Sequence, residues 1–525
     1  MDRQERKFVY DPQQWLRAGA IALLILGIFF RFYQLDEKVY WLDEARTSLR
    51  MSGHTKAEFI QEVYTGQVVS LDTLQQYQRP GEASWGDTFN ALRGNAEHTP
   101  LYFVLARLWT ETWGYSVTTI RSLSAVISLL VFPCLFWFCQ ELFHKQEKMS
   151  QAIAWMALSL VAISPLHVLY AQEARPYSLW TVMTLLSSAM LLRSLRSSGS
   201  RAWIAYGVTI ALGLYTQLLF ALVILAHGLY VAIVARRQII SYGLATLGGV
   251  LTFSPWLVLL LSHIEQVNAA TVATTRQYPL SYLLDQWFLN INRVFINGEL
   301  NSFNLLLVIL TGITLYWLYR KTQPQVWVLI VCLIAVPFLA LALPDVLAGG
   351  ERSLRLRYLI PCYLGIQITF AYFFTTQALW AKRWGQKFWR LVLILLLVSG
   401  ILACTVNTQD RVGWTKSIRK SGYYPIAASW INAADRPLVI SDEQSEDLLS
   451  FSYELKPEVK FQLVTQPRRL KIAEGYGSVY LLNPSARLKN LLERRNYRLL
   501  LLCQDDDDYP GDPADRLWLV KAKES

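Results

Sequence analysis

Long apolar runs separated by short polar turns occupy most of the chain up to residue 406. Runs of about 20 apolar residues are what a bilayer requires of a helix that crosses it. The pattern therefore predicts about eleven transmembrane helices, at residues 16–35, 121–143, 150–166, 177–195, 202–216, 218–235, 240–262, 303–319, 325–343, 357–379 and 389–406. The first run has no small-residue cleavage site and carries Arg31 near its end, so we expect a retained anchor and not a removed signal peptide.

A long polar segment, residues 36–99, follows the first run, and a short apolar piece at 101–114 comes after it. This piece is too short to cross a membrane as a helix, and it contains Arg107 and Glu111. We expect it to lie along the outer membrane surface as a juxtamembrane helix. Residues 36–120 then form the first outer loop.

The pattern changes from residue 407 onward. Short β-friendly runs at 437–442, 461–466, 478–483, 497–503 and 517–522 predict strands, with helical patterns at 444–455 and 486–495 between them. Alternating strands and helices predict a small α/β domain. We interpret the run Asp505–Asp508 as a solvated loop, not as a metal site. The predicted fold is thus mainly α: a polytopic transmembrane domain over residues 1–406, followed by an α/β domain over 407–525.

The distribution of charge predicts the orientation. Residues 407–525 carry 18 Lys/Arg and 17 Asp/Glu, so +10 of the net charge of +11 belongs to the apolar part. Much of it lies in short turns near 144–148, 193–201, 236–237, 320–321 and 382–390, which is typical of cytosolic loops and not of a nucleic-acid-binding surface. We therefore expect a protein of the cell membrane, with a cytosolic N-terminus and an extracytoplasmic C-terminal domain. The six cysteines show neither disulfide nor metal-type spacing.

The first candidate site follows the first span at once, in Tyr40–Thr47. Asp43 and Glu44 are adjacent carboxylates at the expected boundary between the hydrocarbon core of the membrane and water. A charge at that depth is energetically costly, so the pair is a candidate functional site. One of them can serve as a general base toward an attacking hydroxyl. The structural alternative is an acidic pair in the first turn of a helix, where negative charge is favoured.

Two further outer turns gather residues suited to a phosphate. Residues 164–178 contain Gln172, Glu173, Arg175 and Tyr177, and the planar fork of an arginine matches phosphate oxygens. The alternative is a structural Glu–Arg pair. Residues 351–358 contain three arginines on the expected outer side, and binding a lipid phosphate would explain them. Anchoring to anionic headgroups is the alternative there.

Within residues 351–358 we favour Arg357 and Tyr358, with Arg355 beside them. His98 precedes the short apolar piece and is a weaker candidate, because a lone histidine is more often structural. The remaining weak candidates are residues 215–217, Arg276 and Arg293.

Several segments, in order, carry a resemblance to a known superfamily: Trp41–Arg46, His98–Tyr102, Arg121–Ala125, Ser164–Ser178, Leu214–Phe220, Ser254–Trp256 and Arg357–Pro361. Together they resemble the GT-C integral-membrane glycosyltransferases, over residues 10–380. The likeness is nearest to the family-39-type enzymes, which include protein O-mannosyltransferases and lipid A aminoarabinose transferases. The latter carry a lysine before the proline that corresponds to Pro100, whereas this chain has Thr99. The resemblance therefore leaves the donor sugar open.

The resemblance implies a sugar donor linked to polyprenyl phosphate at the outer leaflet, and an acceptor hydroxyl on a glycan, lipid or protein. Asp43 corresponds to the candidate base, and Glu44 and Arg46 complete the Asp-Glu-x-Arg pattern of the aminoarabinose enzymes. We expect an inverting glycosyltransferase in a lipid membrane. The residues expected to bind the donor phosphate are Arg46, Arg175, Arg355, Arg357 and Tyr358, and those expected to bind the substrates are His98, Gln172, Glu173 and Tyr177.

No cofactor is expected to be obligatory. Asp43 and Glu44 could ligate a divalent cation, but no second acidic cluster lies near them in the sequence to complete such a site. A transporter or flippase for lipid-linked saccharides is the alternative function. Transporters place polar groups at the bilayer midplane, often in paired repeats, whereas here the polar residues gather at the outer ends of the spans. A second alternative is an accessory subunit whose C-terminal domain binds glycan.

Overall fold

The computed structural model describes residues 12–145, 147–197, 199–265, 277–298, 304–379, 383–412, 418–505 and 514–522. The chain forms two compact units. Unit 1 comprises Met1–Tyr33, Glu97–Leu101 and Arg121–Thr408, and unit 2 comprises Gln34–Ala96, Tyr102–Ile120 and Gln409–Ser525. Where the sequence suggested one division near residue 406, most of the first outer loop belongs to the same unit as the C-terminal segment.

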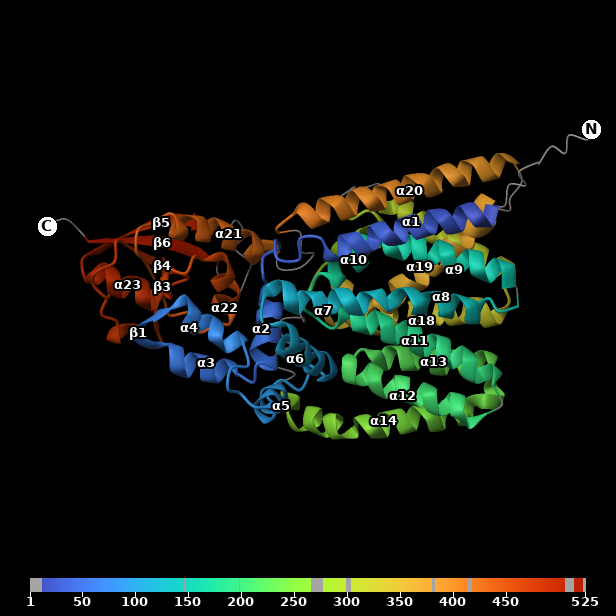
Figure 1. The fold of residues 1–525 in the computed structure, drawn as a ribbon, viewed down its shortest axis with the longest axis horizontal. Helices are drawn as coiled ribbons and strands as arrows, with labels where there is room; N and C mark the ends of the chain where they lie inside the picture. The colour runs from blue at the N-terminus through green and yellow to red at the C-terminus, as the bar shows by residue number, and fades with distance from the viewer. Residues whose placement is uncertain are drawn as a thin grey trace, which may run out of the picture. The chain divides into compact units, whose positions relative to one another are not determined.

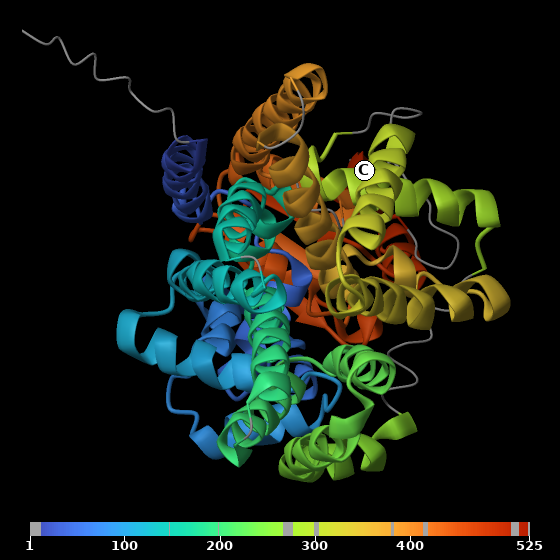
Figure 2. The ribbon, with the colours of Figure 1, turned by 90° about the vertical axis from the view of Figure 1, so that its right-hand side faces the viewer.

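Unit 1 is helical, and Figure 1 shows most of its helices running side by side, while Figure 2 views them from one end. The helices are α1 (Pro12–Phe32), α7 (Val117–Leu129, in unit 1 from Arg121), α8 (Val131–Leu142), α9 (Glu147–Ala162), α10 (Pro165–Ala171), α11 (Tyr177–Arg196), α12 (Ser200–Thr216), α13 (Phe220–Val234), α14 (Ile239–Ser262), α16 (Leu280–Phe295), α17 (Asn304–Lys321), α18 (Pro324–Ala348), α19 (Ile360–Phe374) and α20 (Arg383–Gln409). Short 3₁₀ helices η2 (Arg236–Gln238), η5 (Arg352–Leu354) and η6 (Leu356–Leu359) connect some of them.

Burial differs between the helices of unit 1 as expected for a membrane bundle. Every residue of α19 is buried, which suits a helix that is apolar all round. On α14, by contrast, Leu244 and Val258 are each 66% exposed and Leu261 is 59% exposed. Apolar side chains that face outward in this way are stable in hydrocarbon and not in water.

The predicted number of membrane spans is confirmed in part. A helix lies at each of the eleven expected ranges, but only seven helices in the described part of the chain are long and apolar enough to cross, or eight if the bent pair α9–α10 counts as one span. Helices α12 and α13, for example, have 17 and 15 residues. An apolar run in the sequence does not determine how many of its residues become helical, so it does not determine whether the helix is long enough to cross the membrane. The protein is a multi-pass membrane protein, and the residues that the structure describes include seven or eight clearly apolar spans.

Unit 2 is built around a mixed β-sheet. Its described strands are β1 (Thr65–Ser70), β2 (Pro437–Ser441), β3 (Lys460–Val464), β4 (Ser478–Leu482), β5 (Tyr497–Gln504) and β6 (Arg516–Ala522), in the order β1-β3-β2-β4-β6-β5. Strand β2 runs parallel to both β3 and β4, and the other pairings are antiparallel. All five predicted strands are confirmed. Of the run Asp505–Asp508, residues 506–508 lie outside the described residues.

The sequence did not indicate strand β1, which comes from the first outer loop. Val69 of β1 is in register with Phe461 of β3, so two segments almost 400 residues apart share one sheet. The helices of unit 2 also come from both segments: α2 (Leu42–Met51), α3 (Lys56–Val63), α4 (Leu71–Gln75), α5 (Trp85–Arg93), α6 (Leu101–Trp113), α21 (Ile418–Asn432), α22 (Asp447–Phe451) and α23 (Ala486–Arg494). At 13 residues, α6 is too short to cross a bilayer.

Candidate active site

Helix α2 carries Asp43 and Glu44 in its first turn, but their environments differ. Glu44 is fully buried, and its Oε2 accepts a hydrogen bond of 3.4 Å from the backbone N–H of Trp41. It thus does what an acidic residue at a helix start does, which is the structural alternative considered above. The side chain of Asp43 remains 19% exposed. Of the two carboxylates, Asp43 is therefore the more exposed.

Arg46 lies one turn further along α2. Its Nη1 is 4.0 Å from Asp43 Oδ1, and its Nη2 donates to Glu446 Oε2 at 3.1 Å. The Glu446 side chain is 7% exposed and also lies 3.8 Å from Lys56 Nζ. Arg46 was predicted to bind phosphate, and here its guanidinium also joins α2 to the C-terminal segment of unit 2.

Further hydrogen bonds, within the first loop and from the C-terminal segment, surround the start of α2. The buried Tyr40 hydroxyl donates to the Glu44 carbonyl at 3.1 Å and lies 2.5 Å from Ser48 Oγ. Ser450 donates its hydroxyl to the Tyr40 carbonyl, and Gln78 Nε2 donates to the Leu449 carbonyl at 3.2 Å. Glu446 and Ser450 of the C-terminal segment therefore hold α2 and the residue before it.

In unit 1, the turn between α10 and α11 brings together four predicted residues: Gln172, Glu173, Arg175 and Tyr177, all of them buried. Gln172 Nε2 donates to the carbonyls of Phe30 and Tyr33 at 2.8 and 3.0 Å, so its amide group binds the end of α1. The Arg175 guanidinium lies 5.9 Å from the centre of the Tyr177 ring, within cation–π range. This turn is a buried polar cluster at one end of α11.

The segment between α18 and α19 carries the second predicted group of unit 1. Asp345, near the end of α18, is buried and accepts hydrogen bonds from Ser353 N (2.6 Å), Ser353 Oγ (2.7 Å) and Arg352 Nη1 (3.0 Å). Arg355 is bonded to Glu351. Arg357 and Tyr358 are partly exposed, and the guanidinium lies 5.3 Å from the centre of the tyrosine ring.

Helix α16 braces the same segment. Trp287 Nε1 donates to Ser353 Oγ at 3.0 Å, and Asn290 Nδ2 donates to the Leu354 carbonyl at 3.0 Å. Arg293, a weak candidate from the sequence, donates to Asn290 Oδ1 at 3.1 Å. The other weak candidate of this region, Arg276, lies outside the described residues.

His98 lies in the short Glu97–Leu101 stretch of unit 1 and is partly exposed. Its Nε2 is 3.8 Å from Glu97 Oε1, an ion pair when the ring is protonated. Tyr215, another weak candidate, donates its hydroxyl to the Thr252 carbonyl at 2.9 Å. Neither contact by itself indicates a substrate-binding role.

Two acidic residues that organise these groups were missed in the sequence. Asp345 was detectable, because an acid inside an otherwise apolar run is costly and needs a partner. Glu446 was not, because it is one of four acids in Asp442–Asp447 and only the fold brings it to Arg46. Among the described residues, no group of three or more His, Cys, Asp or Glu gathers to hold a metal ion.

Residues 97–259, just under a third of the chain, match the protein family described as dolichyl-phosphate-mannose-protein mannosyltransferase. The resemblance to the GT-C glycosyltransferases is confirmed. The prediction that the chain is a glycosyltransferase is confirmed by the same match. The match includes the Gln172–Tyr177 turn and ends before Arg357 and Tyr358.

Comparison with solved structures relates the fold of this glycosyltransferase to ArnT from Cupriavidus metallidurans bound to undecaprenyl phosphate. The TM-score is 0.50 at 11% identity, over 97% of this chain and 98% of that one. The oligosaccharyltransferase of Archaeoglobus fulgidus gives a TM-score of 0.49 at 11% identity, over 84% of this chain and 62% of that one. Comparison with curated protein sequences gave no significant match. The likeness to ArnT shows a shared fold, and at 11% identity it shows nothing about the substrates.

Proposed function

We propose that the protein transfers a sugar from a polyprenyl-phosphate-linked donor to an acceptor hydroxyl on the extracytoplasmic side, with inversion at the anomeric carbon. The acceptor oxygen attacks that carbon and forms the new C–O bond. The bond from the carbon to the phosphate oxygen breaks, and polyprenyl phosphate leaves with the electron pair. The carboxylate of Asp43 takes the proton of the acceptor hydroxyl.

The family match supports this assignment, because the family is described by a sugar linked to a lipid phosphate. The structural relative with the same overall fold was solved with undecaprenyl phosphate, which is the leaving group that the proposed reaction produces. The choice of base is supported by exposure: Asp43 can be reached by an acceptor, whereas Glu44 is buried and bonded to the backbone of Trp41.

For the donor phosphate we propose Arg357 and Arg175, with Arg46, Arg355 and Tyr358 as further contacts. Arg357 is the more accessible of the first two, since Arg175 is only 5% exposed. A guanidinium stabilises the negative charge that grows on the phosphate as the sugar departs. His98, Gln172, Glu173 and Tyr177 are proposed to line the substrate site, Gln172 chiefly by holding the end of α1.

The orientation that we propose places the N-terminus in the cytosol and unit 2 outside. Helices α12, α13 and α17 would cross with the apolar spans, which gives eleven crossings. The basic turns at 193–201, 236–237 and 320–321 would then all face the cytosol. Asp72→Cys tests this orientation, because the side chain at this position of the first outer loop is 78% exposed. A membrane-impermeant thiol reagent should label the new cysteine in intact cells, and protection from the reagent would contradict the orientation.

The central test is Asp43→Asn in purified enzyme supplied with a panel of undecaprenyl-phosphate-linked sugars. The readout is release of undecaprenyl phosphate, which does not require the acceptor to be known in advance if a crude envelope extract supplies it. We expect the rate to fall by about 10²–10⁴-fold, the usual contribution of a general base. Asp72→Asn is the matched control, since Asp72 lies in the same loop and its side chain is 78% exposed.

Turnover of Asp43→Asn at the wild-type rate would exclude Asp43 as the base. Absence of release from every donor by the wild-type enzyme would count against the reaction itself. The transporter alternative makes a different prediction: labelled lipid-linked saccharide would cross the membrane of proteoliposomes without being consumed. Deleting residues 407–525 is not a useful test, because Arg46 of α2 would lose Glu446 and the Tyr40 carbonyl just before α2 would lose Ser450.

A further inference from the structure

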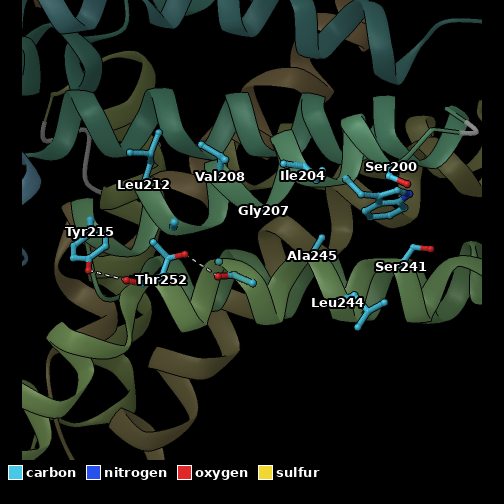
Figure 3. Close-up of a pocket in the computed structure, with 14 residues that line it drawn as sticks. Ser200, Ile204, Gly207, Val208, Leu212, Tyr215, Ser241, Leu244, Ala245 and Thr252 are labelled. Atoms are coloured by element: carbon cyan, nitrogen blue, oxygen red, sulfur yellow. Dashed lines mark hydrogen bonds between the residues drawn. The ribbon is translucent and has the colours of Figure 1, made fainter.

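A groove of about 680 Å³ lies between α12 and α14 in unit 1. One stripe of each helix lines it, and Figure 3 shows the two stripes facing each other. The stripe of α12 runs from Ser200 past Gly207 to Tyr215, and the stripe of α14 runs from Ser241 past Gly248 to Thr252. Most of these side chains are small or apolar, and several are exposed. The groove is thus an apolar surface open to the membrane.

The groove exists because the two helices touch through their backbones beside it. A Cβ atom added at Gly249 would lie 2.7 Å from the Gly207 carbonyl oxygen, and one added at Gly207 would lie 2.9 Å from that of Ala245. Gly248 is different, since a Cβ atom there would meet nothing within 4 Å. The floor of the groove is therefore rigid, and the space above Gly248 is empty of protein.

Positive charge gathers at one end of the groove. Helices α12 and α14 both begin there, with Ser200 and Ser241 close together in Figure 3. Arg201 is the second residue of α12, and Arg236 and Arg237 form η2 directly before α14. Residues 197–262 contain no Asp or Glu at all. Helix N-termini add partial positive charge at the same end, so an anion is favoured there.

The length and the lining of the groove suit a hydrocarbon chain. The α12 stripe from Ser200 to Tyr215 is about 22 Å long at about 1.5 Å per residue. Ile204 and Leu244, which line the groove, are each 66% exposed, and apolar surface of this kind is stable in hydrocarbon. The groove thus offers an apolar length to an acyl chain and a basic end to the anionic headgroup attached to it.

The groove is also separate from the proposed donor site. Helix α11 begins at Tyr177, next to the Gln172–Tyr177 turn, and ends at Arg196, four residues before α12. Its 20 residues are about 30 Å long, the full thickness of the hydrocarbon core. The basic end of the groove and Arg175 therefore lie at opposite ends of α11, and one lipid phosphate cannot serve both.

We propose that this groove binds an anionic phospholipid, with one acyl chain along the stripe of α12 and α14 and the headgroup phosphate at Arg201, Arg236 and Arg237. The lipid belongs to the leaflet opposite the proposed donor. It is a bound component of the membrane bundle and not a substrate. Basic residues between membrane helices are a known arrangement for such headgroups.

The test is native mass spectrometry of the purified enzyme titrated with phosphatidylglycerol, phosphatidylcholine or undecaprenyl phosphate. We expect phosphatidylglycerol to bind at least about tenfold more tightly than phosphatidylcholine, since each arginine near a headgroup contributes roughly fivefold. The triple variant with Arg201→Gln, Arg236→Gln and Arg237→Gln should lose this preference. Gly248→Leu should lose the lipid by filling the groove.

Two matched controls accompany these variants. Gly243→Leu places the same side chain on the same helix, at an exposed glycine that also has open space around it but lies outside the groove. Arg320→Gln removes a basic residue from the exposed end of α17. Both should bind phosphatidylglycerol as the wild type does. A phosphatidylglycerol with a photoreactive group on its acyl chain should label peptides of α12 and α14.

Three results would overturn the proposal. Equal affinity for the two phospholipids would exclude the arginines as a headgroup site. Unchanged phosphatidylglycerol binding by Gly248→Leu would exclude the groove. Competition by undecaprenyl phosphate, lost in Gly248→Leu, would assign the groove to the donor chain instead. The triple variant could fail to accumulate in the membrane. In that case Gly248→Leu, which keeps all three arginines, and the photolabelled peptides decide the question.

Discussion

Replacing Asp345 by asparagine would test whether the segment before α19 must be held rigid. The carboxylate of Asp345 accepts three hydrogen bonds, two from Ser353 and one from Arg352. Asparagine has nearly the same shape but only one acceptor oxygen. If that oxygen faces Ser353, the amide NH₂ group faces the Arg352 guanidinium, where two donors oppose each other.

The expected magnitude follows from the three bonds. A hydrogen bond to a charged group contributes about 1.5–3 kcal/mol and one between neutral groups about 0.5–1.5 kcal/mol. Weakening or losing three bonds at about 1 kcal/mol each removes about 3 kcal/mol from the free energy that orders residues 349–358. That corresponds to at most about 100-fold in the Kd of a ligand that needs the segment ordered. We expect undecaprenyl phosphate to bind 10- to 100-fold more weakly.

The assay is titration of purified enzyme with undecaprenyl phosphate, read by native mass spectrometry, alongside the thermal midpoint of unfolding. Asp285→Asn is the matched control, because Asp285 is exposed on α16 near the same segment. Ser353→Ala, which loses the hydroxyl but keeps the backbone bond to Asp345, should give a smaller loss. Wild-type affinity in Asp345→Asn, or an equal loss in Asp285→Asn, would refute the reasoning.

Two further predictions concern unit 2. The amide of Gln462 makes three hydrogen bonds to main-chain atoms, so Gln462→Leu should lower the free energy of unfolding by about 2–4 kcal/mol, measured as a drop in thermal midpoint; no drop would contradict this. The hydroxyl and backbone N–H of Ser84 lower the pKa of Asp87. The ionised Asp87 carboxylate therefore stabilises the folded state fully above the ordinary aspartate pKa of about 4. This stabilisation is lost as the pH falls through the lowered pKa of Asp87. Unfolding midpoints between pH 7 and pH 2 should show a smaller acid-induced loss in Asp87→Asn than in the wild type, and parallel curves would refute the assignment.

The strands of the C-terminal segment could be predicted because each is a short β-friendly run between turn residues, and β2, for example, begins and ends within one residue of the expected range. Strand β1 could not be predicted, since Thr65–Ser70 has two apolar residues and becomes a strand only by pairing with the edge of β3. Pairing between distant segments leaves no mark in local sequence. The same limit hid the contact between Arg46 and Glu446.

The candidate site shows a similar division. Charges at the ends of apolar runs indicated Asp43 and Arg357 as candidates, because such positions are costly for a charge, and their roles stay predictions. Without the family resemblance, the local sequence could not distinguish Asp43 from Glu44, since exposure depends on how α2 begins and on what packs against it. It also could not indicate that Gln172 holds the end of α1, which requires both segments to be in place.

The pairing of β1 with β3 has a consequence for biosynthesis. Ser70 leaves the ribosome about 390 residues before its partner Lys460. At about 5–20 residues per second, the first loop waits roughly 20–80 seconds for the strand that completes its sheet. During that interval α2 also lacks Glu446, which accepts from Arg46, and Ser450, which donates to the Tyr40 carbonyl just before the helix. A chain interrupted during translation would therefore carry an unsupported Asp43, so only a finished polypeptide can assemble a competent enzyme.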